Sequence, residues 1–281
     1  MRRAWAWWVA WVDRTEDRRP LTWVRTLVPI AVLGDLVGML RHDAVDAVLY
    51  PASLGGIGPK PANWYLFDGH WWGGPLMWIV MVITLPLAAA GVATRWMLAL
   101  GLVAYAQMGH LFTPGDRAID RLLRTVMIVL ICSAVTDQRP PERIRAWASD
   151  LVRWLLVMVY VSAGIAKIGV LDHWLYASPP ELYTILADPM AGNLDPVWWG
   201  DHPVIFWIGG WGTMIAELSA PVVLVRRWAP YWALLAAPIH LGIALTMDLG
   251  MFSYGMLALY PVLLAPWVEQ ASDAWERWRR R

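Results

Sequence analysis

Long apolar runs with few charges dominate this sequence, as in "LVPIAVLGDLVGML" (27–40) and "WLLVMVYVSAGIA" (154–166). Such runs approach the roughly 20 residues that a helix needs to cross the hydrocarbon core of a bilayer. Only helices and closed barrels satisfy their backbone polar groups there, and the alternating segments of about ten residues that mark a barrel are not visible. With 58% hydrophobic and 16% charged residues, the chain is predicted to be an all-α polytopic membrane protein.

The expected architecture is a bundle of about eight transmembrane helices preceded by an interfacial helix. The first 20 residues join a basic start and an apolar core to a charged "DRTEDRR" segment, which favours an amphipathic segment lying on the membrane. A twin-arginine signal is the alternative. We expect one domain over residues 21–267 and a basic cytoplasmic tail over 268–281. The predicted spans are about 22–40, 74–92, 96–113, 122–136, 150–166, 203–225, 229–247 and 250–267.

The distribution of basic residues predicts the orientation of these spans. If the N-terminus is cytoplasmic, 17 of the 23 Lys and Arg residues lie on the cytoplasmic side, so the positive-inside rule places both termini there, in a bacterial-type plasma membrane. The two long connections, 41–73 and 167–202, then face outward. Because long loops commonly carry function, we expect a site that opens to the outer face.

Composition excludes several classes of function. The net charge of +1 and the lack of a clustered basic patch argue against nucleic acid as a partner. The single cysteine, Cys132, excludes an intrachain disulfide and a cysteine metal site, and no metal is predicted. The sequence has no glycine-rich phosphate loop, no HExxH motif and no GxSxG motif. Redox chemistry would therefore need a bound cofactor.

Two polar residues lie deep in predicted spans and are candidate site residues. A charge at membrane depth costs roughly 2.5 to 3.5 kcal/mol on insertion scales, so each such residue needs a partner or a function. Glu217 lies in "MIAELSAPVVL", and an unpaired carboxylate there would be neutral. His240, in "APIHLGIAL", is its candidate partner.

Other polar residues at membrane depth have a structural and a functional interpretation. Asp35 is predicted to pair with a basic group on another span or to stay protonated. Gln107 and His110 lie about one turn apart near the outer end of the third span. They are read either as hydrogen-bonding groups toward a neighbouring helix or as ligands of a bound molecule.

A cluster of charges, "GDRAIDRLLR" (115–124), leads into the fourth predicted span. Its acidic and basic side chains are spaced to pair on one helical face, which predicts a salt-bridge network. Since outer segments hold few other basic residues, the same cluster is equally a candidate for holding an anion or an acidic side chain. The candidate binding residues here are Asp120, Arg121 and Arg124.

Lys167 lies at the outer end of the fifth predicted span, in "YVSAGIAKIGVLDHW". The small residues at 162–164 allow another helix to approach closely. A lysine in such a packed place would favour the neutral amine that a catalytic base needs. A lysine that extends its ammonium to the interface is the simpler interpretation from local physics alone.

Several segments together resemble a known family. The motif "VYVSAGIAKIGVLDHW" (159–174) is similar to the fifth-helix signature of the membrane domain of vitamin K-dependent γ-carboxylase, which is shared with the HTTM (horizontally transferred transmembrane) domain proteins. Further similarity lies in "AELSAPVVLVRR" and "LGMFSYGMLALYPVLLAPW", and, nearer the start, in "RTLVPIAVLGDLVGMLR" and "LYPASLGGIGP". The resemblance covers about residues 20–267.

The resemblance implies a quinol-dependent, oxygen-consuming enzyme. Lys167 would be the base that deprotonates reduced vitamin K or menaquinone, with O2 and CO2 as co-substrates for epoxidation coupled to glutamate carboxylation. Glu217 and His240 would help to form the site, and Trp174, at the end of the motif, would contact substrate or cofactor. The expected partners are membrane lipid and a peptide or protein substrate at the outer face.

The chain also departs from the carboxylase pattern. The large luminal region that recognises substrate propeptides has no counterpart here, and the place of a catalytic histidine reads "GDRAIDRLLR", with His110 the nearest histidine. The sequence is therefore compatible with an enzyme and with a non-catalytic protein. The alternative, suggested by HTTM proteins of peptide-toxin maturation, is a non-catalytic membrane factor that binds a lipid or an exported peptide, with Lys167 as a structural or ligand-pairing cation.

Overall fold

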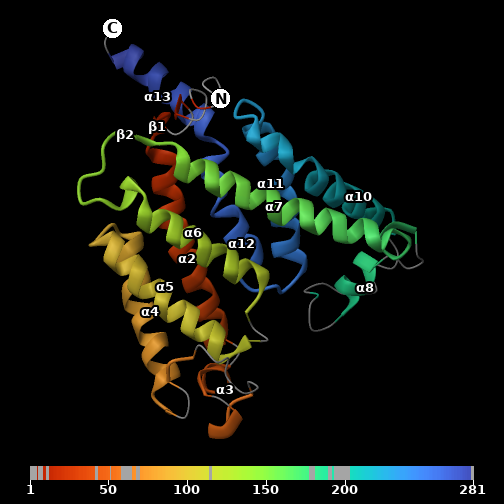
Figure 1. Cartoon of the computed structure of the whole chain (residues 1–281). Coiled ribbons are helices and arrows are strands. Elements are labelled where there is room, and N and C mark those ends of the chain that lie inside the picture. Colours follow the sequence, from red (N-terminus) through yellow and green to blue (C-terminus); the bar gives the residue numbers. More distant parts are fainter. Residues whose placement is uncertain are drawn as a thin grey trace. The chain divides into compact units, whose positions relative to one another are not determined.

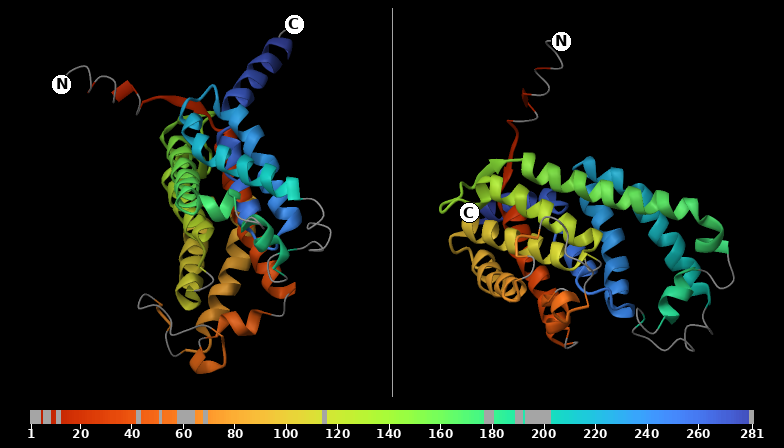
Figure 2. Two further views of the ribbon diagram at one scale, coloured as in Figure 1. Left: turned by 90° about the vertical axis from the view of Figure 1, so that its right-hand side faces the viewer. Right: turned by 60° about the horizontal axis from the view of Figure 1, so that its bottom comes forward.

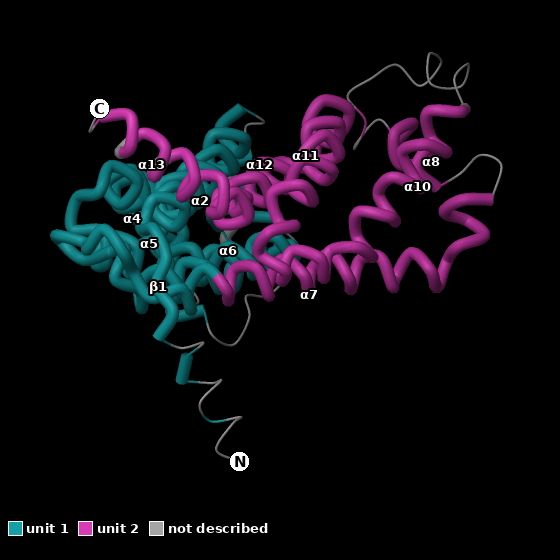
Figure 3. Tube along the Cα trace, turned by 90° about the horizontal axis from the view of Figure 1, so that it is seen from above, with its two compact units in different colours: residues 1–149 teal, residues 150–281 magenta. Residues whose placement is uncertain are grey.

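The computed structural model describes residues 5, 9–10, 13–41, 44–50, 52–57, 65–67, 70–113, 116–176, 181–188, 192 and 203–279. The chain forms two compact units, residues 1–149 and 150–281 (Figure 3). Whether residues 21–267 behave as one domain stays a prediction, and each unit is described by itself.

The first unit is helical apart from one short strand pair (Figure 1). Strands β1 (Thr15–Asp17) and β2 (Arg143–Arg145) pair antiparallel, with Glu16 opposite Ile144. The other elements are α2 (Arg19–Arg41), α3 (Val45–Leu49), the 3-10 helix η1 (Ala52–Leu54), α4 (Gly73–Ala89), α5 (Thr94–Leu111), α6 (Ala118–Cys132) and the 3-10 helix η3 (Ala134–Thr136).

Helices α4 and α5 form the main helix pair of this unit, and α2 and α6 pack beside them (Figure 2). A tight turn at Gly91 and Ala93 joins α4 to α5, and both residues have positive φ (87° and 42°). Glycine adopts this conformation without steric cost, so the chain reverses within a few residues and the two helices lie antiparallel. The core between the helices is aliphatic, with fully buried side chains at Leu21, Val24, Leu85, Leu98 and Leu123.

The second unit begins with α7 (Trp147–Gly169), whose first residues belong to the end of the first unit. The other elements are the π-helix η4 (Asp172–Tyr176), α8 (Glu181–Ala187), α10 (Pro203–Ser219), the 3-10 helix η5 (Ala220–Leu224), α11 (Ala229–Thr246), α12 (Phe252–Leu257), the 3-10 helix η6 (Tyr260–Val262) and α13 (Ala265–Arg279). Helix α11 packs against both α10 and α12.

A buried arginine fastens α7 to η6 in this unit. The Arg153 guanidinium, 3% exposed, donates to the Val262 carbonyl at 2.8 Å and to Asp150 Oδ1 at 2.7 Å. A buried guanidinium needs such partners because an unpaired charge in an apolar interior is costly. This contact fixes the first turns of α7, whose other end carries Lys167.

Among the described residues, three helices are long and apolar enough to cross a membrane: α2, α7 and α11. Helix α4 is apolar but shorter. Helices also occur where four of the other predicted spans were placed, at α4, α5, α6 and α10. The predicted all-helical membrane architecture is thus confirmed. Among the described residues, however, three helices and not eight are long and apolar enough to span a membrane.

The last predicted span, 250–267, is not one helix. It is divided into α12, η6 and the first residues of α13. Pro261 lies in η6 and Pro266 near the start of α13, and proline lacks the N–H that a continuing helix needs. Residues 1–4, 6–8 and 11–12 of the expected interfacial helix over residues 1–20 lie outside the described residues. Its described part contains strand β1, and α2 begins at Arg19.

Candidate functional site

Lys167 is joined to a second candidate residue of the same unit. Its Nζ donates to Oε1 of Glu217 at 2.6 Å, and the two side chains are 18% and 9% exposed. The ammonium also lies 4.9 Å from the centre of the Trp174 ring, in a cation-π contact. Three candidates from the sequence, Lys167, Glu217 and Trp174, therefore meet. The lysine is engaged in contacts inside the protein.

The small residue at 164 explains why α7 and α10 approach so closely at this point. A Cβ built on Gly164 would lie 2.9 Å from Leu218 Cδ2 and 3.1 Å from Glu217 Cβ. Residues three apart share a helical face, so Gly164 and Lys167 both face α10. The predicted close approach at 162–164 is confirmed at Gly164. Ser162, by contrast, is exposed and donates to the Val159 carbonyl.

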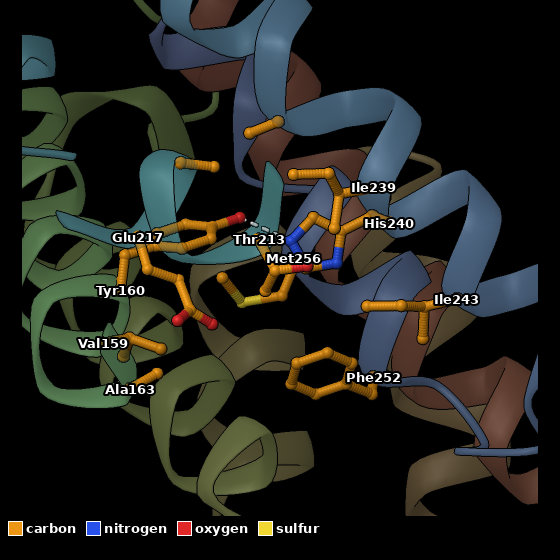
Figure 4. A pocket seen from close by; sticks show the side chains of 12 residues that line it. Val159, Tyr160, Ala163, Thr213, Glu217, Ile239, His240, Ile243, Phe252 and Met256 are labelled. Atoms are coloured by element: carbon orange, nitrogen blue, oxygen red, sulfur yellow. Dashed lines mark hydrogen bonds between the residues drawn. The ribbon is translucent and has the colours of Figure 1, made fainter. Parts of the chain in front are cut away.

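A cavity of about 60 Å³ lies beside this ion pair (Figure 4). Most of its wall is apolar, and four lining residues carry polar side chains: Tyr160, Thr213, Glu217 and His240. The remaining lining residues are Val159, Ala163, Ala216, Ala236, Ile239, Ile243, Phe252 and Met256. The wall therefore comes from α7, α10, α11 and α12, all within the second unit.

A chain of three hydrogen-bonded side chains continues from the cavity wall into the core. Tyr160 Oη lies 2.5 Å from His240 Nε2 and 2.6 Å from Tyr260 Oη. All three residues are buried, and the Trp232 ring meets Tyr160 edge to face at 4.8 Å between centroids. Trp232 is itself fixed, because its indole N–H donates to the Ala216 carbonyl at 3.1 Å. The position of the His240 ring is thus set by Tyr160 of α7, which is itself held by Tyr260 of η6 and Trp232 of α11.

Two polar atoms of the cavity-lining residues have no hydrogen-bond partner among the described residues: Glu217 Oε2 and His240 Nδ1. Both residues are buried, at 7% and 3% exposure. In Figure 4 the imidazole turns its second nitrogen to the side of the cavity where Ile243 and Phe252 lie, and the Glu217 carboxylate lies across from it. Buried polar atoms are normally hydrogen-bonded, so this pair marks where a further group can bind.

The polar candidates of the first unit form a separate network. Arg117 donates to Asp35 Oδ1 at 2.9 Å and to Asp120 Oδ2 at 3.0 Å, and Tyr105 donates to Asp120 Oδ1 at 2.6 Å. Burial by itself lowers the pKa of Arg117, but the hydrogen bonds and negative charges of Asp120 and Asp35 outweigh it and raise the pKa. The predicted pairing of Asp35 with a basic group is confirmed, and that group is Arg117.

The other charged candidates of this unit are compensated within the same segment. Asp116 accepts from Arg121 Nε at 3.0 Å and lies 2.6 Å from Arg124 Nη2. Arg124 also lies over the Tyr105 ring, at 5.3 Å from its centroid. These contacts support the salt-bridge interpretation, since one carboxylate serves both arginines. Anion binding at Arg121 and Arg124 stays a prediction.

The two remaining candidates lie on α5. Gln107 is buried, and its Oε1 accepts a hydrogen bond from the backbone N–H of Leu66 at 2.8 Å. It therefore bonds to a connecting segment, where the sequence suggested a neighbouring helix. His110 is half-buried in the last turn of α5.

Sequence reasoning missed Tyr160 and Tyr260 as site residues. Tyr160 lies seven positions before Lys167, which puts both on one face of α7, and this spacing was the available signal. Tyr260 gave no comparable local signal, because its role depends on the bend at η6. No group of three or more His, Cys, Asp or Glu side chains in the described part of the chain is placed to hold a metal ion.

The region that contains this site matches a known protein family. The family model of the HTTM domain matches residues 128–267, a region that includes Lys167, Trp174, Glu217 and His240 as well as Tyr160 and Tyr260. No curated protein and no solved structure matches the chain. With α2, α7 and α11 as helices able to span a membrane, the chain is a membrane protein whose residues 128–267 form an HTTM domain.

Proposed function

We propose that this membrane protein with an HTTM domain binds the polar end of an amphipathic molecule, a membrane lipid or a small exported peptide, in the cavity of its second unit. Oε2 of Glu217 accepts a hydrogen bond from that molecule, and the apolar wall contacts its body. One observation carries the proposal: a carboxylate oxygen without a hydrogen-bond partner among the described residues belongs to a buried residue that lines a cavity.

Lys167 forms a hydrogen bond with only one of the two oxygens of the Glu217 carboxylate. Oε1 is bonded to the Lys167 ammonium at 2.6 Å, which holds the carboxylate in place. Leaving a buried acceptor unsatisfied costs roughly 1 to 3 kcal/mol, and more for a charged group. A ligand that donates to Oε2 removes this cost, and Lys167 fixes the direction in which the oxygen points.

The size of the cavity favours a small polar group over the two fused rings of reduced vitamin K or menaquinone. An apolar cavity that holds a single benzene ring measures on the order of 150 Å³, whereas this cavity measures about 60 Å³. The available room suits one hydrogen-bonding group and the first carbons attached to it.

The contacts of Lys167 support the binding proposal. Its Nζ donates to Glu217 Oε1 at 2.6 Å and lies 4.9 Å from the centre of the Trp174 ring, so the amine is held by groups of the protein. In this arrangement the lysine positions Glu217. Epoxidation and carboxylation become the competing hypothesis, which the experiment below tests directly.

We also propose that the end of α7 that carries Lys167 lies on the outer side of the membrane, with both termini cytoplasmic. The excess of Lys and Arg in the segments assigned to the cytoplasm supports this orientation. A cysteine introduced at Asp172, just beyond α7, is then expected to react with a membrane-impermeant maleimide in intact cells, whereas one introduced at Arg277 reacts only after lysis. The reverse pattern would overturn the orientation.

The binding experiment uses the full chain in lipid nanodiscs and a photoactivatable fatty alcohol that carries a diazirine near its hydroxyl end. The expected result is cross-linking to residues of α7, α10 or α11 that line the cavity, with labelling reduced about tenfold in Glu217→Gln. Glu269→Gln is the matched control, because Glu269 is also paired with a cation in this unit, Arg226 at 2.5 Å, away from the cavity. Equal labelling of the two variants would overturn the proposal.

A second arm separates binding from catalysis. The same preparation is given reduced menaquinone, oxygen and labelled bicarbonate, and the products are examined by mass spectrometry. Epoxide formation in the wild type that is lost in Lys167→Ala would establish the enzyme and overturn the non-catalytic proposal. Absence of epoxide together with Glu217-dependent labelling supports the binding protein.

A further inference from the structure

We infer that the group taken by this cavity is a hydroxyl, the end of an unbranched aliphatic alcohol, which donates to Glu217 Oε2 and accepts from His240 Nδ1–H. This inference rests on the proposed function and narrows it from any hydrogen-bond donor to one chemical class. It is argued from the direction of the hydrogen bonds that link Tyr260, Tyr160 and His240.

Counting protons fixes that direction. Each tyrosine hydroxyl has one proton, and a neutral imidazole carries one on either nitrogen. If Tyr260 donates to Tyr160 and Tyr160 donates to His240 Nε2, both hydroxyl protons are used. In the opposite order, Nε2–H donates to Tyr160 and Tyr160 donates to Tyr260. The Tyr260 proton, on a residue only 5% exposed, then has no acceptor within the chain of three, and Nδ1 is also left unpaired.

The first order is favoured because it leaves one unpaired group where the second leaves two. A buried donor without an acceptor costs the full penalty of its desolvation. Nε2 is therefore the acceptor for Tyr160, and the imidazole proton lies on Nδ1. His240 Nδ1–H is thus a donor, and Glu217 Oε2 an acceptor, on two residues that line the same cavity.

Because His240 offers a donor and Glu217 an acceptor, the ligand that fits best both donates and accepts a hydrogen bond. A hydroxyl has one proton to give to Glu217 and lone pairs to accept from Nδ1–H, both on a single atom. An ammonium has no lone pair for His240, and an ether or a ketone has no proton for Glu217. An ionised carboxylic acid is repelled by the Glu217 charge. A peptide amide has both functions, but on two atoms, and needs more room than about 60 Å³ provides.

The rest of the cavity explains the preference for an unbranched chain. Ile243, Phe252 and Met256 contribute apolar side chains to its wall, so the carbons beside the hydroxyl contact hydrocarbon. The small volume of about 60 Å³ favours a linear chain over a ring or a branch beside the hydroxyl. The ligand class is thus a primary alcohol on a linear chain, as a membrane can supply.

The first test reads the position of the imidazole proton. The full chain is labelled with 15N-histidine in nanodiscs, and the resonances of His240 are identified by their loss in His240→Phe, because the protein contains six histidines. The expected result is an Nδ1–H tautomer in the wild type. Tyr160→Phe removes the donor to Nε2 and is expected to shift the population toward Nε2–H, the form preferred by free histidine. An Nε2–H tautomer in the wild type would overturn the inference.

The second test compares probes of equal length: 1-octanol, octylammonium and octane, at equal concentration in the nanodisc membrane. The expected order has octanol about tenfold tighter than octylammonium, which forms one hydrogen bond fewer, and tighter still relative to octane, which forms none. His240→Phe lowers octanol affinity about tenfold and leaves octylammonium affinity within about twofold. Ile185→Leu is the control, since this partly buried residue of α8 is not among the cavity-lining residues.

The outcomes separate the two proposals. If octylammonium binds more tightly than octanol and depends on Glu217, the alcohol assignment fails while the proposed binding function stands. If no probe binds while the Nδ1–H tautomer is present, the cavity holds water only, and both proposals fall. Octanol selectivity that requires both His240 and Glu217 supports both.

Discussion

The Lys167 ammonium and the Glu217 carboxylate lie 2.6 Å apart although 50 positions separate them in the sequence. This pair connects the most distinctive motif of the chain to a cavity that Lys167 itself does not line. Two residues that each looked like a catalytic group in isolation are partners. Their chemistry must therefore be tested as that of a pair.

Removing the lysine alone should destabilise the second unit. In Lys167→Met, Glu217 keeps a buried charge without its cation, and we expect a loss of about 3 kcal/mol in the free energy of unfolding, measured by denaturant titration in detergent. The double variant Lys167→Met, Glu217→Leu should recover most of this loss. Arg226→Met is the control, because the Arg226 and Glu269 side chains are 28% and 25% exposed, and it should cost about 1 kcal/mol or less. Equal losses in Lys167→Met and Arg226→Met would show that the pair is not buried.

The two tyrosines of the hydrogen-bonded chain should contribute unequally. Tyr160→Phe removes two hydrogen bonds and leaves the Tyr260 proton without an acceptor, so we expect a loss of about 2 kcal/mol. Tyr260→Phe removes one bond and leaves the Tyr160 proton on His240, so about 1 kcal/mol is expected. The unfolding free energies of both variants, measured in the same detergent, decide the matter. A loss of about 2 kcal/mol in Tyr260→Phe would contradict donation from Tyr260 to Tyr160, because in the opposite order the Tyr160 proton would be left without its acceptor.

Two glycines on facing helices should respond to alanine with opposite signs. Gly164→Ala places a Cβ 2.9 Å from Leu218 Cδ2 and 3.1 Å from Glu217 Cβ, and the strain should exceed the gain in helix propensity, for a net loss of about 1 kcal/mol. Gly212→Ala meets no atom within 4 Å and should gain up to about 1 kcal/mol from propensity alone. Thermal unfolding of both variants tests this. Stabilisation by Gly164→Ala would contradict the close approach of α7 and α10.

Arg117 should be the most sensitive charge of the first unit. It bridges Asp35 and Asp120, so Arg117→Met leaves two acidic side chains without that cation and should cost about 2 kcal/mol in unfolding free energy. Arg117→Lys should recover part of the loss, because one ammonium lacks the fork that reaches two carboxylates. Arg121→Met is the control, since its side chain is 68% exposed, and should cost about 1 kcal/mol or less. An Arg117→Met variant as stable as Arg121→Met would contradict a structural role for this bridge.

The helical class and most helix positions could be read from the sequence because the run of apolar side chains is a local property. Predicted spans at about 22–40, 150–166 and 229–247 correspond to α2, α7 and α11. The segment 250–267 was misjudged because its hydropathy is continuous while its backbone is not. Prolines at 261 and 266 divide it, and local backbone geometry outweighs composition there.

The sequence by itself determined that Asp35, Lys167, Glu217 and His240 needed partners, because the cost of an isolated polar group in an apolar segment does not depend on the rest of the fold. Only the tertiary structure decided which partners they have. Arg117 reaches Asp35 from 82 positions away, and Tyr160 reaches His240 across 80. Such pairings depend on which helical faces meet, and helical periodicity fixes the face of each residue but not the helix that packs against it.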